Sequence, residues 1–267
     1  MSRAALPLAR VNRAPSERLF RVLARIVAPV LRTFTRQDWR GGDKVPRTGG
    51  VIVVANHISN FDPVALGHFL IWHGRWPRAL AKSELWHLPV IGWLAGSLAQ
   101  IPVERRTGRA GESLTAAAEA LSRGECVVIY PEGTITSDPD GWPMTGRPGA
   151  ARLALETGAT VLPIGQWGAQ QVMPGRRVRF PRLLPRATMQ VLVGDPVDLA
   201  DLREARYAPT AAAEGSLRIM DAVTALVGEL RGQAPPAERY DLRAGRRIPR
   251  DWAGEVVRPG DEFPITN

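Results

Sequence analysis

The sequence predicts an α/β fold, a single domain in which helices cover a mostly parallel sheet, with a basic amphipathic helix at the N-terminus. Short β-branched runs alternate with helical patterns along most of the 267 residues, and the 45% hydrophobic content is ample for a buried core. We divide the chain into a basic amphipathic segment at 1–47, the α/β domain at 48–231 and an extended C-terminal tail at 232–267.

The basic charge of the chain is concentrated in residues 1–47. This segment has a net charge of +8, which leaves +1 of the total of +9 for the other 220 residues. Residues 16–36 are expected to form a helix capped by Ser16 and bent near Pro29. Its apolar residues share one face and its arginines the opposite face: Leu19, Val22, Leu23, Ile26, Val27, Val30, Leu31 and Phe34 against Arg18, Arg21, Arg25 and Arg32.

Such a helix is suited to lie on an anionic membrane surface, with its arginines at the lipid head groups. In the alternative interpretation, the apolar face packs on the core of the protein and the arginines are only solvated. Both interpretations can hold together. A third one, a basic module that binds nucleic acid, lacks interleaved stacking aromatic residues and any recognised motif, so we expect no nucleic-acid partner.

Strand and helix patterns alternate after this segment. The run Gly50–Ala55 is predicted to be a buried strand, and a helix begins at Asp62 and Pro63, with the aspartate as N-cap. The uncharged stretch 85–103 is predicted to form a short helix and a strand, with Trp86 and Trp93 available to a membrane-facing surface, although most of its side chains are expected in the core. Further strands are predicted over 78–81, 100–103, 126–130, 160–164 and 189–193, and further helices over 89–99, 112–122, 149–156 and 211–230.

Several classes of protein are excluded by what the sequence lacks. The single cysteine, Cys126, excludes an intrachain disulfide and a thiolate metal cluster, and no metal site is expected. The sequence contains no nucleotide-binding glycine loop, zinc-protease helix or serine-hydrolase elbow. The first thirty residues carry a charge every few positions and hold no signal-peptide core or membrane span, so we expect a cytosolic chain.

The best candidate for chemistry is the segment NHISNFD, which follows the strand 50–55. Its His57 and Asp62 lie at a strand-to-helix turn, where α/β folds commonly place their sites. An imidazole beside a carboxylate forms a general base, because the carboxylate fixes the tautomer and stabilises the imidazolium. The alternative is that Asp62 only caps the helix and His57 is an ordinary turn residue.

Two further groups of residues follow predicted strands. Glu132, Gly133 and Thr134 come after the strand 126–130, and their turn can present backbone amides to a phosphate or an oxyanion, or can be a turn without a ligand. Basic residues lie at other strand or helix ends, where arginine suits phosphate binding, and the argument for them depends on their convergence: Lys82, Arg105, Arg106 and Arg147.

These segments resemble the glycerolipid acyltransferases typified by 1-acyl-sn-glycerol-3-phosphate acyltransferase. The resemblance rests on NHISNFD, AKSELWHLPVIGWL, IPVERR, YPEGT and VLPIG, which occur in the family's order between residues 51 and 165. It implies transfer of a fatty acyl group from acyl-CoA or acyl-carrier protein to the free hydroxyl of 1-acyl-sn-glycerol 3-phosphate, giving phosphatidic acid, with no other cofactor, at the cytoplasmic face of the cell membrane. It also implies the acceptor alternatives glycerol 3-phosphate, another lysophospholipid or a glycolipid.

The resemblance implies a role for each site residue. His57 takes the proton of the acceptor hydroxyl, Asp62 orients His57, and Arg105 helps to hold the substrate phosphate. The segment 132–134 shapes the acceptor site. The sequence departs from the family pattern at Ile135, where an arginine usually follows E-G-T, and Lys82, Arg105 and Arg147 are candidates to compensate.

Overall fold

A computed structural model describes residues 6–14, 16–104, 110–177 and 180–250 of the chain. Its centre is a seven-stranded sheet in the order β1-β7-β6-β2-β5-β3-β4. All pairings are parallel except that of β6 with β7, so β1 and β7 run opposite to the other five strands. The strands are β1 (Thr35–Arg40), β2 (Val51–Ala55), β3 (Pro77–Lys82), β4 (Ile101–Val103), β5 (Cys126–Ile129), β6 (Thr160–Trp167) and β7 (Ala187–Val193).

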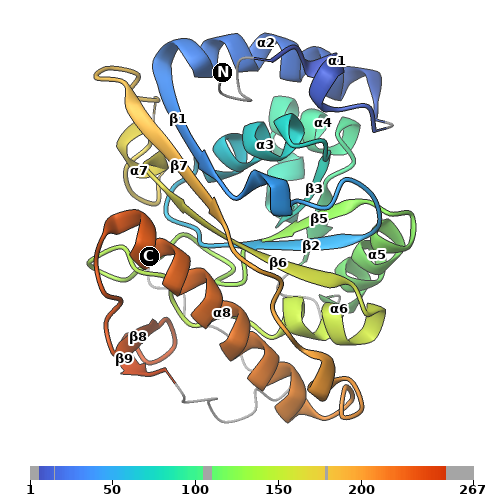
Figure 1. The fold of residues 1–267 in the computed structure, drawn as a ribbon, viewed down its shortest axis with the longest axis vertical. Coiled ribbons are helices and arrows are strands. Elements are labelled where there is room, and N and C mark those ends of the chain that lie inside the picture. Colours follow the sequence, from blue (N-terminus) through green and yellow to red (C-terminus); the bar gives the residue numbers. More distant parts are fainter. Residues whose placement is uncertain (1–5, 15, 105–109, 178–179, 251–267) are drawn as a thin grey trace.

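Helices cover both faces of this sheet, which confirms the predicted α/β class (Figure 1). The helix α3 packs on one face, and α5, α6 and α8 pack on the other. The helices are α1 (Leu8–Val11), α2 (Arg18–Phe34), α3 (Asp62–Trp72), α4 (Pro89–Ser97), α5 (Ala110–Ser122), α6 (Gly149–Thr157), α7 (Ala169–Val172) and α8 (Pro209–Arg231), with 3-10 turns η2 (Gly42–Lys44), η3 (Ser83–His87) and η4 (Ala200–Leu202).

The central strand β2 explains why the core has two halves. All five of its residues are buried, because parallel strands covered on both faces alternate between two apolar layers. Ile52 and Val54 contribute to the layer under α5, α6 and α8, whereas Val51 and Val53 contribute to the layer under α3. The continuous apolar run in the sequence therefore marks the centre of the sheet.

The helix α2 forms an outer layer over α3, but apart from Leu31 it does so with residues outside the apolar face that the sequence predicts. The residues it buries against α3 and its neighbours are Phe20, Ala24, Ala28 and Leu31. Much of the predicted apolar face is exposed, and the exposed large side chains on it are Val22, Ile26, Val27 and Val30. Packing against the core therefore does not explain why these positions of α2 are apolar. Ser16 does not cap the helix, since its Oγ accepts a hydrogen bond from Nε of Arg21.

Two regions differ from the sequence expectations. Strand β1 was not expected because its residues are mostly polar, as suits a strand at the edge of a sheet. The tail expected to be extended begins instead with a hairpin of β8 (Glu238–Asp241) and β9 (Arg246–Pro249). Residues 251–267 of that tail lie outside the described part. No helix within the described residues is both long and apolar enough to cross a bilayer.

Candidate active site

The loop between β2 and α3 brings His57 and Asp62 together. Nδ1 of His57 lies 2.8 Å from Oδ2 of Asp62, which also accepts hydrogen bonds from the backbone N–H groups of Ile58 at 2.6 Å and Ser59 at 2.8 Å. Asp62 is therefore not the helix cap that the sequence suggests. The cap position is occupied by Phe61, and the carboxylate turns back to the loop that precedes the helix.

The two side chains of this pair differ in their access to solvent. The carboxylate of Asp62 is completely buried, whereas the imidazole of His57 is 17% exposed. Burial raises the pKa of Asp62, and the hydrogen bonds from His57, Ser59 and Ile58 oppose that shift. Because three donors converge on Oδ2, Nδ1 of His57 carries its hydrogen there and Nε2 is left as the basic nitrogen.

Hydrogen bonds join the loop of His57 to the turn that follows β5. Oε1 of Glu132 accepts from the backbone N–H of His57 at 2.7 Å, and Oε2 accepts from the N–H of Met144 at 2.9 Å. The carbonyl of His57 accepts from the N–H of Thr136 at 2.7 Å. Burial raises the pKa of Glu132 to about 8, against the effect of the two N–H donors. Glu132 therefore holds the two loops in register.

The ring of Tyr130 supports the imidazole from one side. The two rings stack with centroids 4.4 Å apart and an angle of 25° between their planes. Tyr130 directly precedes the turn 131–134, and its stacking restricts the orientation of the His57 ring. The sequence motif contains this residue, but nothing in its spacing indicated that it touches the base.

Further polar contacts fix the ends of the strands beside the site. Asn56 and Gln166 exchange three hydrogen bonds that tie the end of β2 to β6. The hydroxyl of Ser59 can donate to the carbonyl of Met173, at 2.8 Å, or to that of Ala169, at 3.1 Å. These hydrogen bonds join the loop that carries His57 to residues 166–173, which lie more than 100 positions later in the sequence. The sequence did not predict these pairs, because the partners lie far apart along the chain.

The other expected residues lie at different distances along the same edge. Gly133 has a φ of +72°, and a side chain there would meet Nε of Arg147 at 2.8 Å, so the turn and Arg147 are in close contact. Thr134 follows in the same turn and is partly exposed. Lys82 is exposed at the end of β3, which is separated from β2 by β5. Arg105 and Arg106 lie outside the described residues.

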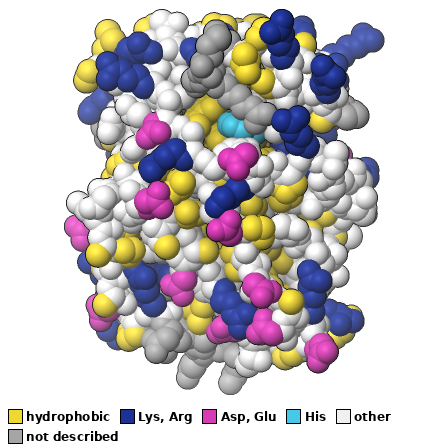
Figure 2. All heavy atoms as spheres, in the orientation of Figure 1, with side chains coloured by type: hydrophobic (Ala, Val, Ile, Leu, Met, Phe, Trp, Pro, Cys, Tyr) yellow, Lys and Arg dark blue, Asp and Glu magenta, His cyan; other side chains and the backbone are white. Residues whose placement is uncertain are grey.

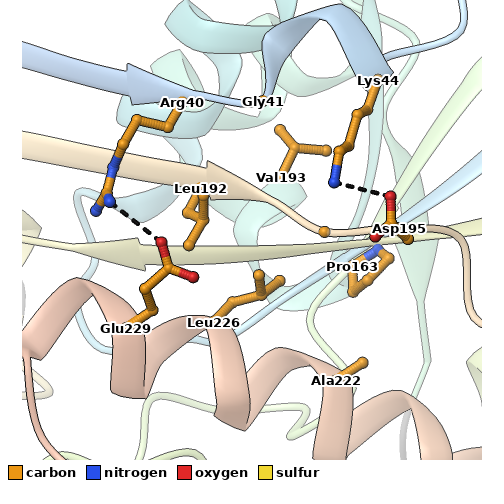
Figure 3. Close-up of a pocket in the computed structure, with 11 residues that line it drawn as sticks. Arg40, Gly41, Lys44, Pro163, Leu192, Val193, Asp195, Ala222, Leu226 and Glu229 are labelled. Carbon is orange, nitrogen blue, oxygen red and sulfur yellow. Dashed lines mark hydrogen bonds and ion pairs between the residues drawn. The ribbon is translucent and has the colours of Figure 1, made fainter.

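A groove of about 580 Å³ lies elsewhere, between the ends of β1 and β7 and the helix α8. Figure 3 shows its charged residues pointing toward one another, Arg40 toward Glu229 at 3.2 Å and Lys44 toward Asp195 at 2.8 Å. None of the candidate site residues lines this groove. Because its charges are paired, the groove has no evident cationic or anionic ligand, and the candidate site remains the loop cluster around His57.

Comparisons with known proteins show the family of the chain and relate its fold to a solved structure. The sequence profile of the acyltransferase family matches residues 36–167, about half of the chain. This range contains the loop of His57 and the loop of Glu132. This part of the chain belongs to the acyltransferase family. Proteins similar to it include several 1-acyl-sn-glycerol-3-phosphate acyltransferases.

The similarity to individual relatives is moderate. A chloroplast 1-acyl-sn-glycerol-3-phosphate acyltransferase of Brassica napus is 29% identical over 53% of this chain and 40% of its own length. The Pseudomonas aeruginosa enzyme of the same name is 28% identical over 64% of this chain and 61% of its own. The crystal structure of a 1-acyl-sn-glycerophosphate acyltransferase from Thermotoga maritima superimposes with a TM-score of 0.62 over 82% of both chains, at 23% identity. The chain spans about two-fifths of the length of the plant relatives it matches.

Proposed function

We propose that the chain is an O-acyltransferase that moves a fatty acyl group from an acyl thioester to the free hydroxyl of 1-acyl-sn-glycerol 3-phosphate, giving phosphatidic acid. The donor is acyl-CoA or acyl-carrier protein. The observation that carries the proposal is the contact between the partly exposed His57 and the buried Asp62, at a sheet edge within the family match.

The proposed reaction uses His57 as base and then as acid. Nε2 of His57 takes the proton of the acceptor hydroxyl while the oxygen attacks the thioester carbonyl carbon. The new C–O bond forms, the C–S bond of the tetrahedral intermediate breaks, and the proton passes from Nε2 to the departing thiolate. Asp62 keeps Nδ1 protonated and stabilises the imidazolium during the step. A thioester is already activated, so positioning and charge stabilisation supply the rest of the acceleration.

The acceptor is held by the cations at the same edge in this proposal. Arg147 contacts the turn 132–134, Lys82 ends β3, and Arg105 comes two positions after β4 in the sequence. We assign these residues to the substrate phosphate, and we assign Gly133 and Thr134 to the wall of the acceptor site. Glu132 shapes that wall through its backbone contacts.

We further propose that the protein binds the cytoplasmic face of the cell membrane as a peripheral or monotopic protein. The support is the outer face of α2, where Val22, Ile26 and Val30 are exposed beside arginines. Figure 2 shows Lys and Arg side chains interspersed with hydrophobic ones at the edge of the molecule formed by α1 and α2. Exposed apolar side chains between cations fit a lipid interface better than a nucleic-acid backbone.

An acceptor and donor panel tests the reaction. The purified protein is incubated with lysophosphatidic acid and an acyl thioester, and thiol release and the lipid product are measured, the latter by mass spectrometry. We expect phosphatidic acid, with glycerol 3-phosphate, other lysophospholipids and glycolipids as poorer acceptors. A His57→Ala variant with unchanged circular dichroism should lose most of the activity. Full activity in that variant would overturn the assignment of the base.

A further inference from the structure

An arginine outside every motif reaches the candidate site from the loop between α7 and β7. Nη1 of Arg176 donates to the hydroxyl of Ser137 at 2.8 Å, and Nη2 donates to the hydroxyl of Thr134 at 3.2 Å. The backbone carbonyl of Arg176 accepts a hydrogen bond from Nδ2 of Asn60 at 3.2 Å. Arg176 therefore touches both loops that build the site, the one that carries His57 and the one that carries Glu132.

No carboxylate among the described residues neutralises the positive charge of Arg176. Arg176 is exposed, and within the part of the chain that the structure describes it takes part in no ion pair. Several other arginines donate to acids instead, as Arg247 does to Asp138 and Arg78 to Glu17. Two neutral hydroxyls orient the fork of Arg176 and leave its charge and its remaining N–H donors available.

The turn that Arg176 contacts lacks a cation at the position after Thr134. That position is Ile135, whose side chain is buried. Arg147 lies against the same turn at Gly133, so two guanidinium groups contact consecutive residues of it. A pair of cations at one turn that also carries hydroxyl groups is an arrangement that suits a phosphate group.

We propose that Arg176 binds the phosphate of the acceptor and makes this chain prefer an anionic acceptor over a neutral one. The inference depends on the proposed acyl transfer and specifies how its acceptor is recognised. Arg176 acts as the cation that Ile135 does not supply. The planar guanidinium can bind two phosphate oxygens at once, which a lysine ammonium cannot do with the same geometry.

The test compares two acceptors that differ only in the phosphate. Wild type, Arg176→Ala, Arg176→Lys and Arg177→Ala are assayed with lysophosphatidic acid and with 1-monoacylglycerol in the same detergent micelles and with the same donor. Arg177 is the adjacent exposed arginine, so its variant makes the same change of charge one residue away. We expect Arg176→Ala to raise KM for lysophosphatidic acid about ten- to hundredfold, with the lysine variant intermediate.

The neutral acceptor separates recognition from a purely structural role. We expect kcat/KM for 1-monoacylglycerol to change less than about threefold in Arg176→Ala, because no phosphate contact is lost there. Equal losses with both acceptors, an unchanged KM for lysophosphatidic acid, or the same effect in Arg177→Ala would overturn the proposal.

A binding measurement keeps this proposal separate from the proposed reaction. Calorimetric binding of lysophosphatidic acid micelles is compared between His57→Ala and His57→Ala with Arg176→Ala, neither of which needs to turn over. Weaker binding on loss of Arg176 supports the phosphate contact even if the wild type acylates nothing, an outcome that refutes the acyl-transfer proposal alone. Equal binding by the two variants overturns the role of Arg176.

Discussion

Oδ2 of Asp62 accepts hydrogen bonds from Nδ1 of His57 and from two backbone N–H groups, while its Oδ1 is buried without a partner among the described residues. Oδ2 of Asp62 therefore positions the imidazole of His57, and the negative charge of the whole carboxylate stabilises the imidazolium. This geometry allows the two contributions to be separated by substitution.

An Asp62→Asn variant should keep the positioning and lose the charge. An asparagine can place its carbonyl oxygen at the Oδ2 position and its amide at the Oδ1 position, so the three donors retain an acceptor. The imidazolium that forms during proton transfer is then no longer stabilised. We expect kcat with lysophosphatidic acid to fall about 100- to 10,000-fold, with a much smaller change in KM.

The control for this variant is the double substitution. Because His57 and Asp62 act as a unit, His57→Ala with Asp62→Asn should be no slower than His57→Ala alone. Losses that multiply in the double variant would show that Asp62 acts independently of His57.

Glu132 should make the folded state less stable as the pH rises. Its pKa is about 8 in the folded protein because of burial, against an ordinary value of 4.5. The folded state therefore binds a proton more tightly than the unfolded state, and the resulting stabilisation is complete below about pH 4.5 and is lost as the pH rises to about 8. The unfolding free energy should decrease over this window by up to about 1.4 kcal/mol per pH unit from this one group.

Urea denaturation of wild type and Glu132→Gln between pH 5 and 8 measures this effect. The glutamine variant should be less stable overall, because its amide NH₂ must face the N–H of His57 or Met144, but its stability should depend less on pH. Parallel pH profiles for the two proteins would contradict the assignment.

Arg78 should anchor the start of α2 to the sheet. Its guanidinium, on β3, donates to Glu17 at 2.8 Å, to Glu125 at 3.0 Å and to the carbonyl of Leu98 at 2.9 Å. An Arg78→Met variant should lose about 2–3 kcal/mol of unfolding free energy, because Glu17 loses the partner at 2.8 Å, Glu125 keeps only Arg123, and both carboxylates are only partly exposed.

The matched control is Glu17→Gln, which removes one charge and leaves Arg78 paired with Glu125. It should cost about 1 kcal/mol or less. Thermal denaturation compares the two variants, and a larger loss in Glu17→Gln than in Arg78→Met would show that Arg78 is not the centre of this network.

The sequence predicted the parts of the fold in which local pattern and burial agree. The strands β2 and β5 are entirely apolar because both of their faces are covered, and that composition made them recognisable. β1 was missed because an edge strand tolerates charged residues, and its pairing with β7 joins segments about 150 residues apart. The hairpin of β8 and β9 was missed for a related reason, since only two of its four residues in β8 are buried.

In the candidate site as well, the sequence predicted the local pair and not the contacts between distant segments. The pairing of His57 with Asp62 is local and followed from spacing across one turn, although the carboxylate does not cap the helix. The contact of Arg176 with Thr134 spans 42 residues and depends on the path of a loop that no motif marks. Glu132 was expected to help shape the acceptor site, but nothing in the sequence indicated that its two oxygens accept hydrogen bonds from backbone N–H groups.

The outer face of α2 should bind anionic vesicles through its apolar residues as well as its arginines. Ile26 is 61% exposed, so Ile26→Glu should weaken binding without disturbing the buried side of the helix, which Ala24 and Ala28 form. We expect a loss of about ten- to hundredfold in partitioning, the amount that removing one buried apolar side chain corresponds to. Trp93 on α4 is also 61% exposed. Its replacement in the Ile26→Glu variant should increase the loss of partitioning where α4 contacts the same bilayer.

Vesicle flotation with anionic and neutral lipids at several salt concentrations measures this binding. Tyr207→Glu is the control, because Tyr207 is 81% exposed just before α8, whose first turn lies at the end of the molecule away from α2 (Figure 1). It introduces the same charge and should leave partitioning unchanged. Since apolar insertion is insensitive to salt and arginine contacts are screened by it, wild type should retain part of its binding at high salt and Ile26→Glu should lose it. Equal binding by both variants, or stronger binding to duplex DNA than to anionic vesicles, would rule out α2 as a membrane-binding surface.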